Sequence, residues 1–502
     1  MDAIADQRAR LNKAAADFVA KPKKLLIDGE WVDAKSGKTF STVDPATGLE
    51  ITRLAEGDAA DVDVAARAAR RAFEEGEWPR LRPRDRQRLL LKLADLVEAH
   101  ADELAEIEAL DNGKPVTYAR FVDVNMAVDF LRYMAGWATK IEGTTLDLST
   151  GFTPDDQFFA YVRKEAVGVV GQIIPWNFPL VMAAWKLGPA LATGCTVLLK
   201  PAEQTSLSAL RLGELVMEAG FPKGVVNIIT GFGGTAGAAI VEHPEVDKIA
   251  FTGSTAVGKL IGMAAMKTMK RVSLELGGKS PVVVMADANL ETAIPGAAMA
   301  VFFNMGQVCT AGSRLFVERK VFDQVTEGVA EVAKSMKIGA GLDPASQLGP
   351  LVSAVQRDRV MAYIQSGLAE GGRALTGGQV IGGAGCFVEP TVFVDVNSSM
   401  KVVREEIFGP VVVAQPIDDI ANIPAMANDT IYGLGASIWS NNLSFVHRLV
   451  PKIKAGTVWV NCHNFLDPAL PFGGYKQSGV GREMGRAVLD LYTESKSVLM
   501  QI

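Results

Sequence analysis

The chain has 502 residues, of which 48% are hydrophobic and 22% are charged, a balance typical of a globular protein with a large core. It excludes a disordered chain, a collagen-like fibre and a small disulfide scaffold. The formal net charge of −6 excludes a general basic field, so we expect no nucleic-acid partner and no binding to an anionic membrane. A typical domain of ~150 residues predicts about three domains.

The four cysteines and four histidines form no CxxC pair and have no zinc-ligand spacing. We therefore expect reduced thiols, no metal site and a cytoplasmic location. The N-terminal residues are charged every few positions and lack the apolar core of a signal peptide. Residues 166–185 carry no charge, but Pro175 and Pro179 interrupt them, which favours a buried strand and turn over a membrane helix.

The expected elements begin with a polar helix in the first ~25 residues. A strand pair at residues 24–31 and 41–48 follows, and residues 59–73 and 84–110 show helical periodicity. Strands and helices then alternate, with strands at 168–175, 195–201, 225–231 and 248–254 and helices at 207–219 and 255–266. This alternation predicts a parallel sheet with helices on both faces and a ligand crevice at the carboxyl ends of its strands.

A second alternating series follows residue 276. It has helices at 289–305 and 321–336 and strands at 280–285, 313–319, 390–396, 409–417, 436–440 and 456–461. Because no proline-rich linker separates the two series, we expect the domains to pack closely. Residues 489–502 end in an alternating pattern like that of an edge strand, which would pair either within the chain or with another chain.

Three segments have the features of a nucleotide site. Residues 253–260 (GSTAVGKL) nearly match a P-loop, but Leu260 replaces the Ser or Thr that would hold magnesium, which disfavours an NTPase. There Gly253 and Ser254 form either a pyrophosphate-binding turn or a plain N-cap. Residues 231–236 (GFGGTA) form a glycine-rich turn after a strand. Lys200 and Glu203 close a strand, as a surface ion pair or as ribose contacts that would favour NAD over NADP.

Three further residues suggest acyl chemistry. Cys309 lies among small, uncharged residues and is a candidate nucleophile. Glu275, between two leucines at a predicted strand end, is a candidate general base with a raised pKa. Asn177, between two prolines, is either an oxyanion donor or a residue that stabilises its own turn. By residue type alone, structural roles for all three stay open.

Together these residues resemble the aldehyde dehydrogenase superfamily over nearly the whole chain. Seven runs match in the family's order and spacing: PWNFPL, KPAEQTS, FTGSTAVGK, LELGGKSP, GQVCTAGSR, EEIFGPV and PFGGYKQSG. The resemblance implies that Cys309 is the nucleophile, Glu275 the general base and Asn177 the oxyanion-stabilising amide, with Lys186 near the site. Because CoA-acylating relatives typically lack the base, its presence favours the hydrolytic branch.

The resemblance also implies the cofactor and the substrate. NAD would contact Lys200 and Glu203 through its adenosine ribose, Ser254 and Gly253 through its pyrophosphate, and Glu406 and Phe408 through its nicotinamide riboside. Further cofactor contacts would be Trp176 and Gln356. Residues 130–149 and 460–474 resemble phenylacetaldehyde dehydrogenases. The aldehyde tunnel would be lined by Met126, Phe178, Val181, Met182, Trp185, Phe303, Phe465, Leu466 and Phe472.

The implied fold class is α/β, with a Rossmann-like NAD-binding domain, an α/β catalytic domain and a small β oligomerisation domain. Their expected ranges are 1–141 with 165–276 for the first, 277–483 for the second, and 142–164 with 484–502 for the third. The family suggests a homotetramer or homodimer. Such a tunnel suits phenylacetaldehyde or a similar aryl aldehyde, but an apolar tunnel also suits medium-chain aliphatic aldehydes. A P-loop hydrolase and a non-catalytic protein on the same fold are the alternatives.

Overall fold

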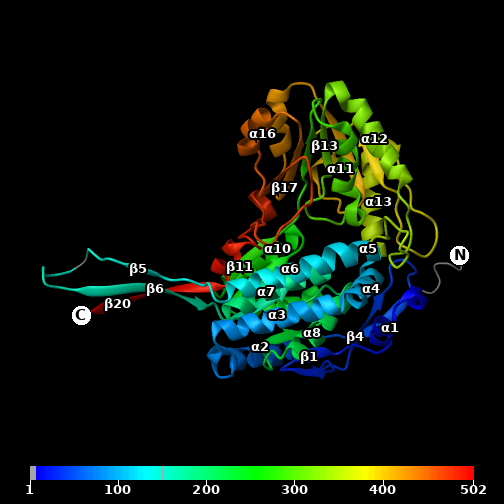
Figure 1. The fold of residues 1–502 in the computed structure, drawn as a ribbon. Coiled ribbons are helices and arrows are strands. Elements are labelled where there is room, and N and C mark those ends of the chain that lie inside the picture. Colours follow the sequence, from blue (N-terminus) through cyan, green and yellow to red (C-terminus); the bar gives the residue numbers. More distant parts are fainter. Residues whose placement is uncertain (1–6, 150) are drawn as a thin grey trace.

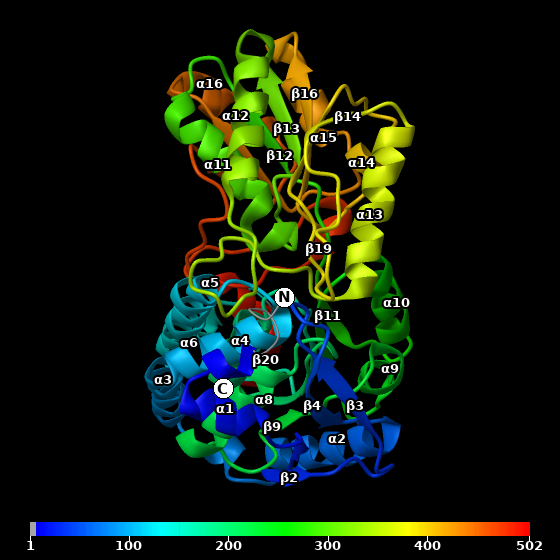
Figure 2. The same ribbon diagram turned by 90° about the vertical axis from the view of Figure 1, so that its right-hand side faces the viewer.

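The computed structural model describes residues 7–149 and 151–502. Two α/β bodies lie end to end, and a long β-arm made of β5, β6 and β20 projects from the lower body (Figure 1). Seen from the side, the N-terminal elements and α2–α10 surround the lower body, while α11–α16 belong to the upper one (Figure 2). The expected α/β fold class is therefore confirmed.

The lower body contains an eight-stranded sheet. Its strand order is β19 (Gly479–Val480), β11 (Arg271–Glu275), β10 (Lys248–Thr252), β7 (Val169–Ile173), β8 (Thr196–Lys200), β9 (Val226–Ile228), β1 (Leu25–Ile27) and β2 (Glu30–Val32). The strands from β11 to β9 run parallel, and the chain order reverses between β7 and β10. Such a reversal marks the place where an open α/β sheet has its ligand crevice.

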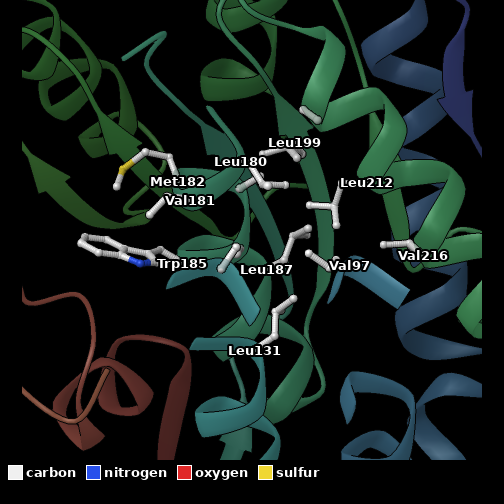
Figure 3. Close-up of a cluster of buried hydrophobic side chains, with 14 of the residues drawn as sticks. Val97, Leu131, Leu180, Val181, Met182, Trp185, Leu187, Leu199, Leu212 and Val216 are labelled. Atoms are coloured by element: carbon white, nitrogen blue, oxygen red, sulfur yellow. The ribbon is translucent and has the colours of Figure 1, made fainter. Parts of the chain in front are cut away.

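Helices cover both faces of this sheet. On one face lie α3 (Pro83–Ala99), α4 (Ala101–Asn112), α6 (Asn125–Trp137), α7 (Pro179–Thr193) and α8 (Leu207–Ala219). On the other lie α2 (Ala59–Glu74), α9 (Ala238–Glu242) and α10 (Thr255–Met266). In Figure 3, Leu187 of α7 points toward Leu131 and Val97, whereas Met182 and Trp185 lie on the opposite side of the cluster. The helix α7 therefore has one side for the core and one for the site described below.

The upper body contains a seven-stranded sheet, parallel except for its first strand. The order is β14 (Arg373–Thr376), β15 (Thr391–Val394), β16 (Val411–Ile417), β13 (Arg314–Glu318), β12 (Pro281–Val284), β17 (Gly435–Trp439) and β18 (Thr457–Val460). Its helices are α11 (Leu290–Phe302), α12 (Phe322–Ser335), α13 (Ala354–Ala369), α14 (Lys401–Arg404), α15 (Ile423–Asn428) and α16 (Leu443–Leu449).

The arm is a three-stranded antiparallel sheet of β20 (Thr493–Gln501), β6 (Phe158–Ala166) and β5 (Thr144–Leu146). The C-terminal strand thus pairs within the chain, and in the described residues its outer edge has no partner strand. The remaining elements are α1 (Lys13–Val19), β3 (Thr39–Val43), β4 (Glu50–Ala55), α5 (Val116–Tyr118) and several 3₁₀ and π turns. Within the described ranges, no helix is long and apolar enough to cross a membrane.

Several expected boundaries need correction. The helix expected over residues 84–110 is two helices that meet at His100, and the helix expected to Met305 ends at Phe302. Residues 24–31 contain the β1–β2 hairpin, and β3 pairs instead with β4. The polar N-terminal helix is only a 3₁₀ turn and α1, and residues 1–6 lie outside the described structure. The two-residue β19 joins the lower sheet, although its residues fall in the range expected for the catalytic domain.

Candidate active site

Two cavities meet at Cys309, between the two bodies. Both are lined by Phe178, Met182, Thr252, Glu275, Leu276 and Cys309. Thr252 and Glu275 are the last residues of the adjacent parallel strands β10 and β11 and lie opposite each other. The site is therefore at the carboxyl edge of the lower sheet, as the strand pattern predicts.

Cys309 follows a strained turn that carries it out of α11. Asn304 and Met305 have φ values of +47° and +56°, and Gly306 has a φ of +70°. A Cβ on Gly306 would lie 2.0 Å from the Gly409 carbonyl oxygen, so the turn requires glycine there. Burial raises the pKa of the Cys309 thiol to about 12, and the carboxylates Glu406 and Glu275 add to the effect. The thiol is accessible from both cavities but protonated until its surroundings change.

The Glu275 carboxyl is buried, and neither of its oxygens has a hydrogen-bond partner among the described residues. Burial raises its pKa well above the ordinary value, and the Glu483 carboxylate raises it further. A carboxyl that is poorly solvated and lines the same cavities as a thiol can take a proton near neutral pH. The desolvated environment expected between Leu274 and Leu276 is confirmed.

Asn177 lies two residues before the start of α7 and contacts the turn that carries Cys309. Its Nδ2 donates to the Gln307 carbonyl at 2.8 Å, and its own carbonyl accepts from Asn304 Nδ2 at 3.1 Å. The side chain therefore bridges two distant segments, and the alternative in which it only stabilises its own turn is wrong. Gln307 accepts from one hydrogen of this Nδ2. Among the described residues no acceptor takes the other hydrogen, so it can donate to an oxyanion.

The first cavity brings together most of the residues expected to hold a cofactor. Its lining includes Trp176, Gly253, Ser254, Gln356, Glu406 and Phe408. The Trp176 and Phe408 rings meet edge to face with centroids 5.1 Å apart, and Gln356 Nε2 donates to the Phe408 carbonyl at 2.7 Å. Gln356 therefore supports Phe408, while the two rings form an apolar wall.

Three of the residues expected to contact the cofactor have ionisable side chains: Glu406, Lys200 and Glu203. Glu406 accepts from the Gly278 amide at 2.9 Å, and burial raises its pKa to about 7. Lys200 is buried at the end of β8, with its Nζ 3.3 Å from Glu203 Oε2. Lys200 and Glu203 are outside the described lining of both cavities. The Lys200 stem lies 3.5 Å from a Cβ placed on Gly237, the residue after the glycine-rich turn of residues 231–236. Ser254 caps α10 by accepting from Val257 N at 3.4 Å, so the N-cap interpretation holds for the free protein.

The second cavity contains most of the residues expected to line the aldehyde tunnel. Of the nine residues expected to line it, eight do so: Met126, Phe178, Val181, Met182, Trp185, Phe303, Leu466 and Phe472. Phe465 does not line the described cavity and is 73% exposed. Trp459 Nε1 donates to the Phe465 carbonyl at 2.7 Å, which holds the backbone while the ring points to solvent. Phe465 as a tunnel wall is therefore a wrong expectation.

A model of the aldehyde dehydrogenase family matches residues 31–498. The chain belongs to this family. It is 54% identical over 493 residues to the putative aldehyde dehydrogenase DhaS of Bacillus subtilis, covering 98% of each chain. It is 50% identical to a phenylacetaldehyde dehydrogenase of Pseudomonas fluorescens, covering 97% of each. An NAD+ complex of an aldehyde dehydrogenase from Bacillus cereus matches with a TM-score of 0.96 and 50% identity, covering 98% of this chain and 99% of that one.

Several residues of this aldehyde dehydrogenase site were missed by sequence reasoning. Glu483 lines the tunnel and forms a buried ion pair with Lys186 of α7. Arg359 lines the first cavity, and Asp123 and Asn464 line the second. No local pattern marks any of them, because they reach the site only through the tertiary fold. In the described part of the chain, no three His, Cys, Asp or Glu side chains gather as metal ligands.

Proposed function

We propose that this aldehyde dehydrogenase oxidises an aryl aldehyde, phenylacetaldehyde or a close analogue, to the carboxylic acid with NAD. The observation that carries the proposal is the apolar tunnel that ends at Cys309, beside Glu275, and whose wall contains the rings of Phe178, Trp185, Phe303 and Phe472. Phe178 stacks on Phe303 with centroids 6.2 Å apart, and Trp185 meets Phe472 edge to face at 5.6 Å. Such walls favour a flat apolar substituent.

The first cavity fits NAD. Backbone amides and the Ser254 hydroxyl at the start of α10 suit a pyrophosphate, and Glu406 suits ribose hydroxyls. Glu203, outside the lining of this cavity, would accept the hydroxyls of the adenosine ribose beyond it. When bound, NAD accepts the hydride that leaves the substrate carbon. A carboxylate at Glu203 would repel a 2′-phosphate, which favours NAD over NADP. The residues proposed to contact NAD also include Trp176, Lys200, Gly253 and Phe408. Gln356 would act on NAD through Phe408.

Cys309 begins the reaction. Its thiol gives up a proton to a water molecule, and the sulfur forms a bond with the aldehyde carbon while the carbonyl electron pair moves to oxygen. The free N–H of Asn177 and the Cys309 backbone N–H stabilise that oxygen. Loss of hydride from the carbon then leaves a thioester on Cys309.

Glu275 completes the reaction by deacylation. The ionised carboxylate takes a proton from a water molecule, and the resulting hydroxide attacks the thioester carbon. The C–S bond breaks, the carboxylic acid leaves, and Cys309 recovers a proton. The Lys186–Glu483 pair lies behind this base and lines the tunnel through Glu483. In this scheme Lys186 acts on the site through Glu483.

A broad aliphatic specificity is the second candidate. The observation that favours it is the aliphatic part of the tunnel wall, which consists of Val122, Val181, Leu276, Val308, Leu434 and Leu466. The test is kcat/KM, followed by NADH formation, for phenylacetaldehyde, 3-phenylpropanal, hexanal and octanal. The proposal expects both aryl aldehydes to exceed both alkanals by at least about tenfold, which corresponds to ~1.4 kcal/mol of transition-state binding. Equal values across the four would establish the aliphatic alternative.

The domain ranges, oligomeric state and location are also proposals. Each of the three large sheets draws its strands mainly from one of the expected domains. The outer edge of β20 offers a surface for assembly into a homodimer or homotetramer. All four cysteines are free thiols, as expected for a cytoplasmic protein. Light scattering of the purified protein measures the oligomeric state directly.

A further inference from the structure

The turn that carries Asn177 is held by a distant segment, residues 108–114 at the end of α4. Asn112 Nδ2 donates to the Trp176 carbonyl at 2.7 Å. Lys114 Nζ lies 4.4 Å from the centroid of the Phe178 ring. Glu108 Oε2 accepts from the Leu180 amide at 3.0 Å. The 108–114 segment thus contacts the residue on either side of Asn177 and the first turn of α7.

Glu108 supplies an interaction that α7 lacks. The helix starts at Pro179, and among the described residues no side chain at the N-cap position, Phe178, accepts a hydrogen bond from its first turn. The four first amides of a helix need acceptors, and an anion is favoured there by the helix dipole. Glu108 meets this need from another helix.

The charge on Glu108 is maintained by a buried triad with Lys114 and Asp123. All three side chains are about 1% exposed. Lys114 Nζ donates to Glu108 Oε1 at 2.9 Å and also to Asp123. Two charged carboxylates around one ammonium would leave a buried net charge, so one carboxyl keeps its proton.

The directions of the pKa shifts favour Asp123 as the carboxyl that keeps this proton. Burial raises the pKa of Asp123 well above its ordinary value, and the neighbouring Glu108 adds to this. Burial also opposes ionisation of Glu108, but Lys114 and a hydrogen bond with Asp123 outweigh it and lower the pKa of Glu108. Glu108 therefore carries the negative charge at the start of α7.

The position of Lys114 depends on Gly113, which has a φ of +89°. A Cβ there would lie 2.8 Å from Pro350 Cγ and 2.9 Å from Pro45 Cγ, so the tight turn admits only glycine. This turn directs Lys114 back toward Glu108 and the Phe178 ring. Phe178 itself lines both cavities.

We propose that Lys114 and Glu108 are positioning residues for the oxyanion-binding amide of Asn177. They fix residues 176–180 so that one Nδ2 hydrogen of Asn177 stays on the Gln307 carbonyl and the other meets the carbonyl oxygen of the bound aldehyde. Neither residue is among those that line the two described cavities, so they act through Asn177. The inference rests on the function proposed above.

The test is a double-mutant cycle on the acylation rate, measured as the pre-steady-state burst of NADH in the full-length enzyme. Asn177→Ala should lower this rate by ~10²–10³-fold, as does the loss of other oxyanion donors. Lys114→Met should lower it by about tenfold or more in the wild type, yet by less than about twofold when Asn177 is already Ala. Such non-additivity is the signature of one residue acting through another. Equal effects in both backgrounds would overturn the proposal, because a general structural defect is additive.

Lys270→Met is the matched control. Lys270 is also buried, and it donates to the carbonyls of His243 and Val246, far from the site along the sheet. This variant should leave the burst rate unchanged, and thermal unfolding of each variant shows which remain folded. If Lys114→Met does not fold, Glu108→Gln replaces it in the same cycle. Its expected loss is smaller, about threefold to tenfold, because Asp123 then ionises beside Lys114.

The experiment distinguishes a failure of the positioning role from a failure of the proposed function. If the wild-type protein gives no aldehyde-dependent burst, the proposed function fails before any variant is compared. If the wild type gives a burst and both Lys114→Met and Glu108→Gln act additively with Asn177→Ala, only the positioning role fails.

Discussion

The Cys309 thiol should resist alkylation in the cofactor-free protein. Burial, Glu406 and Glu275 raise its pKa to about 12, against an ordinary value of 9.0. At pH 8 this leaves roughly 10³-fold less thiolate than an unperturbed thiol would have. The greater intrinsic nucleophilicity of a high-pKa thiolate recovers about 20-fold of that difference. We therefore expect iodoacetamide to modify Cys309 roughly 50-fold more slowly than an ordinary exposed thiol.

The assay is timed iodoacetamide labelling followed by peptide mass spectrometry, at several pH values between 7 and 10.5. Cys309→Ala controls for labelling of the other three cysteines. The Cys309 rate should keep rising with pH and reach no plateau. Glu406→Gln should move this rise to lower pH, and by more than Glu275→Gln does, because Glu406 makes the larger contribution of the two. A plateau below pH 9 in the cofactor-free wild type would refute the reasoning.

Three further predictions concern catalysis and the cofactor. Glu275→Gln should keep the NADH burst but lower the steady-state rate by ~10²-fold or more, because only deacylation needs the base; an unchanged steady-state rate would remove Glu275 from the mechanism. In the wild type the deacylation rate should rise with pH as Glu275, whose pKa is raised, loses its proton, and this rise should be absent in Glu275→Gln; a pH-independent wild-type rate contradicts the assignment. Glu203→Ser should raise kcat/KM with NADP relative to NAD by about tenfold, since it removes a carboxylate that repels the 2′-phosphate; an unchanged ratio counts against Glu203 as the selector.

Much of the fold follows from local pattern. Short β-branched runs closed by glycine or proline predict the parallel strands of both large sheets except β11, but not β14 or β19, and amphipathic periodicity predicts α2, α8, α10 and α12. The errors occur where no local residue marks the break. His100 separates α3 from α4 without a glycine or proline, with a φ of −102° and a ψ of 23°. Asn304 and Met305 adopt left-handed conformations that side chains of their type rarely adopt.

Some residues of the candidate site could also be predicted from the sequence, and others could not. The resemblance to the aldehyde dehydrogenase superfamily implies that Cys309, Glu275 and Asn177 belong to it, and the structure brings all three to one cavity. The sequence could not predict the ion pair of Glu483 with Lys186, which are 297 residues apart. Nor could it predict the contact of Asn177 with Gln307, which are 130 residues apart. These contacts depend on how the two bodies pack, and no periodicity within one element encodes that packing.

The covalent intermediate gives the most direct test of the account. Glu275→Gln protein is mixed with NAD and phenylacetaldehyde, quenched within one turnover, digested and analysed by mass spectrometry. The account predicts an increase in mass equal to the acyl group on the peptide that contains Cys309, together with about one NADH per active site. NADH formation without that adduct, or an adduct on Cys195, Cys386 or Cys462 instead, would contradict it.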